Sequence, residues 1–253
     1  MTSRDYRVVQ AASFNAAAAE YERGRPPYPA QALDWLLPPG VRRVLDLGAG
    51  TGKLTRQLLD RGIDVVAVEP SEEMRHQLTQ VLPHVSVLPG TAEEVPLPDD
   101  AVDTVLVAQA WHWVDVDRAV PEVARVLSAG GQLGLMWNIR DERTDWVRRL
   151  ERIMHRGTEQ EMNGDSPLVG PPFGPIERRD IEWTHQLTRE SLLDLVASRS
   201  YIITLSPAER ATVLAGVHNL LQAHPALCAN EYISMPYLTQ CSRARLSPRT
   251  SGS

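Results

Sequence analysis

The sequence has little of what marks several specialised classes of protein. Only two of its 253 residues are cysteines, Cys228 and Cys241, which are too few for a disulfide framework. No apolar run approaches the ~18 residues that a membrane-spanning helix needs, and no cationic segment followed by an apolar stretch of signal-peptide length opens the chain. We therefore expect a reduced, cytoplasmic protein without a membrane anchor.

Positive charge is not in excess either. The 26 Lys and Arg residues are outnumbered by 32 Asp and Glu residues, giving a net charge of −6. No general basic field therefore favours a nucleic-acid backbone, and we expect no nucleic-acid partner. The histidines make no metal-ligand spacing with either cysteine, so no metal site is expected. A G-x-S-x-G motif, typical of α/β-hydrolases, does not occur.

The most informative stretch that is present is a glycine-rich turn. Residues 44–47 form a short apolar run, residues 54–60 are typical of a helix, and residues 64–69 form a second apolar run. The turn between the first run and the helix contains Gly48, Gly50 and Gly52. Strand, loop, helix and strand thus follow within about thirty residues, which predicts a ligand-binding loop. Glu69, at the end of the second strand, is placed to hold the hydroxyls of a ribose.

Three nucleotide-binding patterns compete for this loop. A P-loop needs glycine and Ser or Thr at the positions of Leu47 and Leu54, so it is excluded. A dinucleotide fingerprint meets Lys53 where its third glycine or an alanine belongs, which weakens this reading without excluding it. The pattern acidic-x-Gly-x-Gly-x-Gly is complete, beginning at Asp46. A carboxylate at that position repels a pyrophosphate and suits a cationic ligand such as S-adenosylmethionine.

Four segments resemble the class I S-adenosylmethionine-dependent methyltransferases, and more closely the methyltransferase type 11 group. They are VLDLGAGTGKLT, VVAVEPSEEM, LPGTAEEVPLPDDAVDTVLVAQAWHW and EVARVLSAGGQLGLMWN, within residues 41–138. The resemblance implies an α/β, Rossmann-like, doubly wound, mostly parallel seven-stranded sheet. It also implies an antiparallel last strand and an N-terminal helical lid.

The resemblance divides the chain into three parts. Residues 1–40 are expected to form the lid, residues 41–142 the core that binds S-adenosylmethionine, and residues 143–253 the rest of the sheet with the acceptor-pocket helices and loop. Residues 138–141, just past the fifth strand, are expected to line the acceptor pocket. The last strand contains Pro236, which favours an edge or bulged position.

The implied cofactor is S-adenosyl-L-methionine, with S-adenosyl-L-homocysteine as product. The resemblance lets Arg25 pair with the methionine carboxylate and brings Met74 and Ala92 to the adenine. The residues expected to bind the cofactor are Tyr21, Arg25, Asp46, Gly48, Ala49, Gly50, Thr51, Gly52, Glu69, Pro70, Met74, Thr91, Ala92, Glu93, Gln109 and Ala110.

One titratable side chain stands between two tryptophans just past the fourth strand. His112, between Trp111 and Trp113, is the candidate base for a hydroxyl acceptor, and the aromatic rings can shield a sulfonium from water. The alternative is a hydrophobic plug with a structural histidine. The expected function is in-line methyl transfer to a small-molecule acceptor. A non-catalytic cofactor-binding module and an NAD(P)-linked oxidoreductase remain alternatives, and the acceptor and the oligomeric state stay open.

Overall fold

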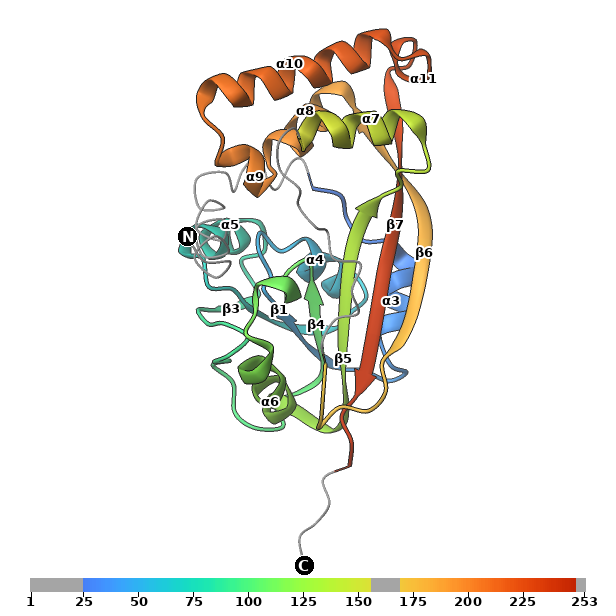
Figure 1. Cartoon of the computed structure of the whole chain (residues 1–253). Coiled ribbons are helices and arrows are strands. Elements are labelled where there is room, and N and C mark those ends of the chain that lie inside the picture. The colour runs from blue at the N-terminus through green and yellow to red at the C-terminus, as the bar shows by residue number, and fades with distance from the viewer. Residues whose placement is uncertain (1–24, 156–168, 249–253) are drawn as a thin grey trace, which may run out of the picture. The chain divides into compact units, whose positions relative to one another are not determined.

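The computed structural model describes residues 25–155 and 169–248. Its strands are β1 (Arg43–Leu47), β2 (Asp64–Val68), β3 (Ser86–Leu88), β4 (Val102–Ala108), β5 (Leu127–Arg140), β6 (Glu177–Thr188) and β7 (Tyr232–Arg245). They form one sheet in the order β3-β2-β1-β4-β5-β7-β6 (Figure 1). The pairs among β1 to β5 are parallel, and the last strands are antiparallel. The expected doubly wound, mostly parallel sheet is confirmed.

The helices are short and connect the strands. They are α3 (Ala30–Leu36), α4 (Lys53–Leu59), α5 (Glu72–Val81), the 3-10 helix η2 (Trp111–Trp113), α6 (Val116–Val126), α7 (Asp145–Met154), α8 (Arg189–Ala197), α9 (Ser200–Ile203), α10 (Pro207–Ala223) and α11 (Pro225–Cys228). None of those described is long and apolar enough to cross a membrane. The helix and much of the lid expected near the N-terminus, with Tyr21, lie outside the described residues.

The described chain divides into two compact units, each assembled from separate segments. The loop unit consists of residues 27–137, 169–181 and 239–248, and the helical unit of residues 25–26, 138–155 and 182–238. Strands β5, β6 and β7 contribute to both units. The glycine-rich loop belongs to the first unit, and α7 to α11 belong to the second.

The core of the loop unit lies on both faces of the sheet. Strands β2 and β4 are almost entirely apolar, as expected of parallel strands covered on both sides. On one face, Ala119 and Val123 of α6 pack with Leu45 and Leu135. On the other, α3 and α4 pack around residues such as Leu106. Because the strands are parallel, their carboxyl ends lie at one edge of the sheet. Ligands bind at this edge in sheets that are covered by helices on both faces.

The helical unit has a separate core, and side chains cap the starts of α8, α10 and α11. Its buried side chains include Leu150 of α7, Leu192 of α8 and Val217 of α10. Helix α10 begins with a capping box formed by Ser206 and Glu209. This unit is therefore stabilised by a hydrophobic core of its own.

The last strand corrects a prediction. Pro236 favoured an edge or bulged position, and the edge position is wrong because β7 lies between β5 and β6. The carbonyl oxygen of Pro236 accepts a hydrogen bond from the backbone N–H of Asp141, one residue past the end of β5. The proline thus lies where pairing with β5 ends, so the missing N–H interrupts little of that ladder.

Candidate functional site

The glycine-rich loop joins β1 to α4 and is held against the end of β2. The backbone N–H groups of Gly48 and Ala49 donate to the carbonyl oxygen of Val68 at 2.8 and 3.1 Å. Gly48 has φ +75°, and a Cβ built there would lie 2.9 Å from the Cβ of Ala110. Glycine is required for two reasons, a left-handed backbone and the close approach of the chain after β4.

Asp46 is the second-last residue of β1, just before this loop, and is almost completely buried, with 1% of its surface exposed. Its Oδ2 atom accepts a hydrogen bond from Oγ1 of Thr55 at 2.6 Å. Its Oδ1 atom is buried and has no hydrogen-bond partner among the described residues. Burial, with a smaller effect of the charge of Glu69, raises the pKa of Asp46 to about 7 although the bond from Thr55 opposes this. The site therefore holds a carboxylate that a nearby cation would stabilise.

Glu69 directly follows β2 and is also buried. Its Oε2 atom accepts from the backbone N–H of Gly50 and its Oε1 atom from that of Ser71, both at 2.9 Å. Burial raises the pKa of Glu69, while these two bonds and the charge of Arg75 act in the opposite direction. Each carboxylate oxygen is fixed in place by one backbone donor and keeps further acceptor capacity, which fits the paired hydroxyls of a ribose.

The chain after β4 is strained where it leaves the sheet. Gln109 has φ +60°, unusual for a residue other than glycine, and its N–H donates to the carbonyl oxygen of Met136 at 2.9 Å. Such strain is typical of functional sites. Trp111 is buried, whereas His112 is exposed, and the ring of Trp113 lies 4.4 Å from the His112 ring. Nε1 of Trp137 donates a long hydrogen bond of 3.5 Å to Nδ1 of His112.

The predicted adenine contacts have defined places in the same unit. Met74 and Ala92 are buried, and the backbone of Thr91 pairs with that of Glu94. The side chain of Glu93 accepts from the backbone N–H of Asp115 at 2.7 Å, so it holds the start of α6. Pro70 is exposed. Their contacts with a cofactor stay predictions.

The loop unit thus contains the predicted cofactor residues other than Tyr21 and Arg25. Tyr21 lies outside the described residues. Arg25 belongs to the helical unit, where its Nη2 atom donates to the carbonyl oxygen of Ser198 at 3.4 Å. Among the described residues, no group of three or more His, Cys, Asp and Glu side chains is arranged to hold a metal ion.

Sequence reasoning missed three residues that support this site. They are Thr55, which holds Asp46, Ser71, which holds Glu69, and Trp137, which contacts His112. Ser71 also caps α5, since its Oγ accepts from the N–H of Met74. The position of Thr55 in the first turn of the helix after the loop was a usable signal.

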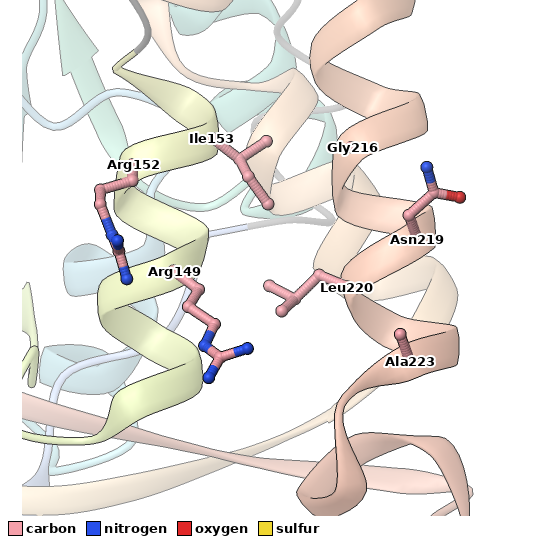
Figure 2. A pocket seen from close by; sticks show the side chains of 7 residues that line it. All are labelled: Arg149, Arg152, Ile153, Gly216, Asn219, Leu220 and Ala223. Atoms are coloured by element: carbon pink, nitrogen blue, oxygen red, sulfur yellow. The ribbon is translucent and has the colours of Figure 1, made fainter.

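A pocket in the helical unit lies between α7 and α10 (Figure 2). Figure 2 shows Ile153 and Leu220 pointing into the space between these helices. The pocket is lined by Arg149, Arg152, Ile153, Gly216, Asn219, Leu220 and Ala223. None of these is a residue that the sequence predicts for a cofactor or an acceptor, so the pocket adds nothing to the site in the loop unit.

The comparisons with known proteins agree with this geometry. Residues 45–135 match the family model described as a methyltransferase domain. An uncharacterized methyltransferase of Mycobacterium tuberculosis is 56% identical over 236 residues, which cover 93% of this chain and 96% of that protein. This identity over nearly the whole of both chains extends the likeness well beyond the residues of the family model.

Two solved structures share the fold. A protein named as a type II methyltransferase from Anaeromyxobacter dehalogenans has a TM-score of 0.67 at 24% identity, over 89% of this chain and 99% of that one. A phosphoethanolamine N-methyltransferase of Haemonchus contortus, solved with phosphomonomethylethanolamine and S-adenosylhomocysteine, has a TM-score of 0.53 at 17% identity. It matches over 93% of this chain and 58% of its own. The relative from Mycobacterium tuberculosis shows that the chain belongs to the methyltransferase domain family, and the sheet and the two solved structures show that it has the class I methyltransferase fold.

Proposed function

We propose that this methyltransferase takes its methyl group from S-adenosyl-L-methionine and transfers it in line to a small-molecule acceptor. The observation that carries the proposal is the pair of buried carboxylates, Asp46 and Glu69, on either side of a glycine loop. Two carboxylates disfavour a pyrophosphate and favour a cationic nucleoside. The relative from Haemonchus contortus, which has the same fold, was solved with S-adenosylhomocysteine.

Each residue of the pair has a different task. Glu69 is fixed by two backbone donors, so its oxygens are ready to accept hydrogen bonds from ribose hydroxyls without rearrangement. Asp46 supplies negative charge, and its Oδ1 atom has acceptor capacity to spare. The bare backbone at Gly48 lets a ligand approach the loop closely. The contacts predicted for Met74, Ala92 and Glu93 belong to the same proposal.

The cofactor brings an already activated methyl group, because a neutral thioether leaves readily from a sulfonium. The protein's part is therefore alignment and exclusion of water rather than covalent catalysis. Trp111 belongs to the core against which the half-buried Trp137 packs, and the ring of the half-buried Trp113 lies against that of His112. We propose that these rings form an apolar wall beside the cofactor. Such a wall suits a sulfonium through its apolar surface and through cation–π attraction.

His112 stays the candidate base for a hydroxyl acceptor. In the structure its Nδ1 atom accepts from Trp137, so the neutral ring carries its proton on Nε2. Nε2 can then donate a hydrogen bond to the hydroxyl oxygen of the methyl acceptor. To remove the proton of that hydroxyl, the ring must present an unprotonated nitrogen to it, so His112 must break its hydrogen bond with Trp137 or change tautomer. A carboxylate or carbon acceptor needs no base. A pH profile of turnover that loses its acidic limb in His112→Gln supports the role of base.

The direct test of the proposal is cofactor binding by Glu69→Gln. Isothermal titration calorimetry with S-adenosylhomocysteine is expected to show at least a 30-fold loss of affinity, because one backbone bond and the ribose acceptors are disturbed in a buried site. Glu72→Gln is the matched control, since Glu72 is exposed in the first turn of α5 and is expected to bind normally. Unchanged affinity in Glu69→Gln contradicts the proposal.

A further inference from the structure

The helical unit contains a group of buried charged and phenolic side chains that the function above does not use. We call it the arginine cluster, and it comprises Arg25, Arg140, Glu151, Arg199, Tyr201 and Tyr237. Arg140 ends β5, three residues after Trp137 along the chain, and forms an ion pair with Glu151 of α7. Arg199 and Tyr201 lie at the α8–α9 turn, and Tyr237 lies on β7.

The cluster is buried, yet several of its polar atoms have no use in the fold. Arg140 is 7% exposed and Tyr237 is 1% exposed. Nη1 of Arg140, Nε of Arg199 and the hydroxyls of Tyr201 and Tyr237 are buried without a hydrogen-bond partner among the described residues. Arg199 as a whole is half-buried. Leaving buried donors unsatisfied costs free energy, and native proteins mostly avoid it unless a ligand uses them.

The charges of the cluster do not balance. The guanidinium groups of Arg140 and Arg199 accompany one carboxylate, that of Glu151, so positive charge is in excess among these three side chains. Burial, followed by the charges of Arg140 and Arg25, lowers the pKa of Arg199. Glu151 is already engaged, because it also accepts from Nε2 of His155 at 3.2 Å. Guanidinium groups that lie close together away from water repel each other, and an anion bound between them reduces this repulsion.

Guanidinium groups bind planar oxyanions through paired hydrogen bonds, and tyrosine hydroxyls add further donors. A carboxylate or a phosphate has the required acceptors and charge. We propose that the arginine cluster binds the anionic group of the acceptor, so that the acceptor is a small molecule that carries a carboxylate or a phosphate. Its assignment to the acceptor, rather than to a separate effector, rests on the methyl-transfer function proposed above.

Binding of simple anions to the full-length chain tests this proposal without turnover. The probes are succinate, inorganic phosphate and succinamide, which matches succinate in shape but has no charge. Calorimetry is expected to show saturable binding of succinate or phosphate, whichever source the site prefers, and none of succinamide. Absence of binding by both anions overturns the proposal.

Arg199→Gln is the informative variant, because it removes one positive charge while leaving the Arg140–Glu151 pair intact. Anion affinity is expected to fall at least tenfold, while the Tm of the ligand-free protein stays the same or rises. A merely structural arginine predicts the reverse, a lower Tm. Tyr237→Phe is expected to weaken anion binding about threefold. The control is Arg152→Gln, on the exposed side of α7; an equal loss of binding there shows a general charge effect and overturns the proposal.

The cofactor also carries a carboxylate, so a second titration tests whether the cluster binds the anionic group of the acceptor or the carboxylate of the cofactor. Affinities of wild type and Arg199→Gln are compared for S-adenosylhomocysteine and for 5′-methylthioadenosine, which lacks the amino-acid end. A selective loss for S-adenosylhomocysteine assigns the cluster to the cofactor and overturns its assignment to the acceptor. If the wild type ignores both nucleosides but binds succinate through Arg199, methyl transfer fails as the function while the anion site stands.

Discussion

The two units place opposite charges in buried surroundings. The loop unit buries two carboxylates, Asp46 and Glu69, beside a bare backbone, whereas the helical unit holds the buried Arg140 and the half-buried Arg199 near one carboxylate, that of Glu151. Burial shifts the pKa values accordingly, raising those of the two acids and lowering that of Arg199. In each unit the isolated protein tolerates an electrostatic penalty that a ligand of the opposite charge relieves.

This contrast separates charge kept for binding from charge kept for the fold. In the helical unit, Arg140 and Glu151 neutralise each other, so neither can be removed alone without harm. Asp46 and Arg199 form no ion pair with a described residue, and removing their charge is expected to leave the stability of the ligand-free protein unchanged or to raise it. Perturbed ionisable groups of this kind mark functional sites more often than structural ones.

The largest expected effect is on the paired charge. Arg140→Met leaves Glu151 buried with His155 as its remaining hydrogen-bond partner and only the more distant charge of Arg199 to compensate it, and we expect the free energy of unfolding to fall by ~3–5 kcal/mol. Urea denaturation measures this. The double variant Arg140→Met with Glu151→Leu is expected to regain much of the loss, because no charge is then left unpaired. A loss below ~1 kcal/mol in the single variant shows that the pair does not hold the unit together.

The next effect is on an unpaired acid. Asp46 has a pKa of about 7 in the folded state and an ordinary value of 3.8, so the folded protein holds the extra proton between these pH values. Stability therefore falls as pH rises through this window and stays reduced above about 7. Asp46→Asn removes this penalty. We therefore expect the difference in the free energy of unfolding between Asp46→Asn and wild type to be ~2 kcal/mol more favourable to the variant at pH 8 than at pH 4.5. Equal differences at both pH values contradict the burial of a charged Asp46.

A pair of glycines isolates the close approach in the loop. Gly48 and Gly62 have almost the same positive φ, +75° and +74°, but only a Cβ at Gly48 would meet a neighbour, at 2.9 Å. We expect Gly62→Ala to cost ~1 kcal/mol and Gly48→Ala ~1–2 kcal/mol more, as read from thermal unfolding. S-adenosylhomocysteine binding is expected to suffer only in Gly48→Ala. Equal effects in the two variants show that the loop has room for a side chain.

The smallest expected effect is the pH dependence of cofactor affinity. A cation favours ionised Asp46, so affinity for S-adenosylmethionine is expected to be constant above pH 7 and to fall as pH drops below it. The fall is expected to approach about tenfold between pH 7.5 and 6, near the limit for one proton. Asp46→Asn, which has no such proton, is expected to bind more weakly but with little dependence on pH. A parallel slope in the variant assigns the effect to another group.

The sequence predicted the loop unit better than the helical unit. The glycine pattern, Asp46 and Glu69 follow one another within one strand–helix–strand segment, so local spacing was enough to bring them together. The doubly wound, mostly parallel seven-stranded sheet also followed from the resemblance. Pro236 misled because its effect on a strand depends on where pairing ends, which the neighbouring strand decides.

The arginine cluster could be predicted only in part. Residues 138–141 were expected to line the acceptor pocket, and this range includes Arg140. Its neighbours Glu151, Arg199 and Tyr237 come from α7, the α8–α9 turn and β7, and none of them stands in a sequence pattern that marks a site. Tertiary packing, not a local pattern, makes them a group. The same is true of Trp137 and His112, which meet only because β4 and β5 pair.

The central claim is that paired carboxylates at a bare backbone bend select a cationic nucleoside. Its most direct measurement is parallel calorimetric titration of the full-length chain with S-adenosylmethionine and NADH under one set of conditions. The account predicts saturable binding of S-adenosylmethionine, with a Kd in the micromolar range, and no measurable binding of NADH. Tight binding of NADH with none of S-adenosylmethionine would contradict it.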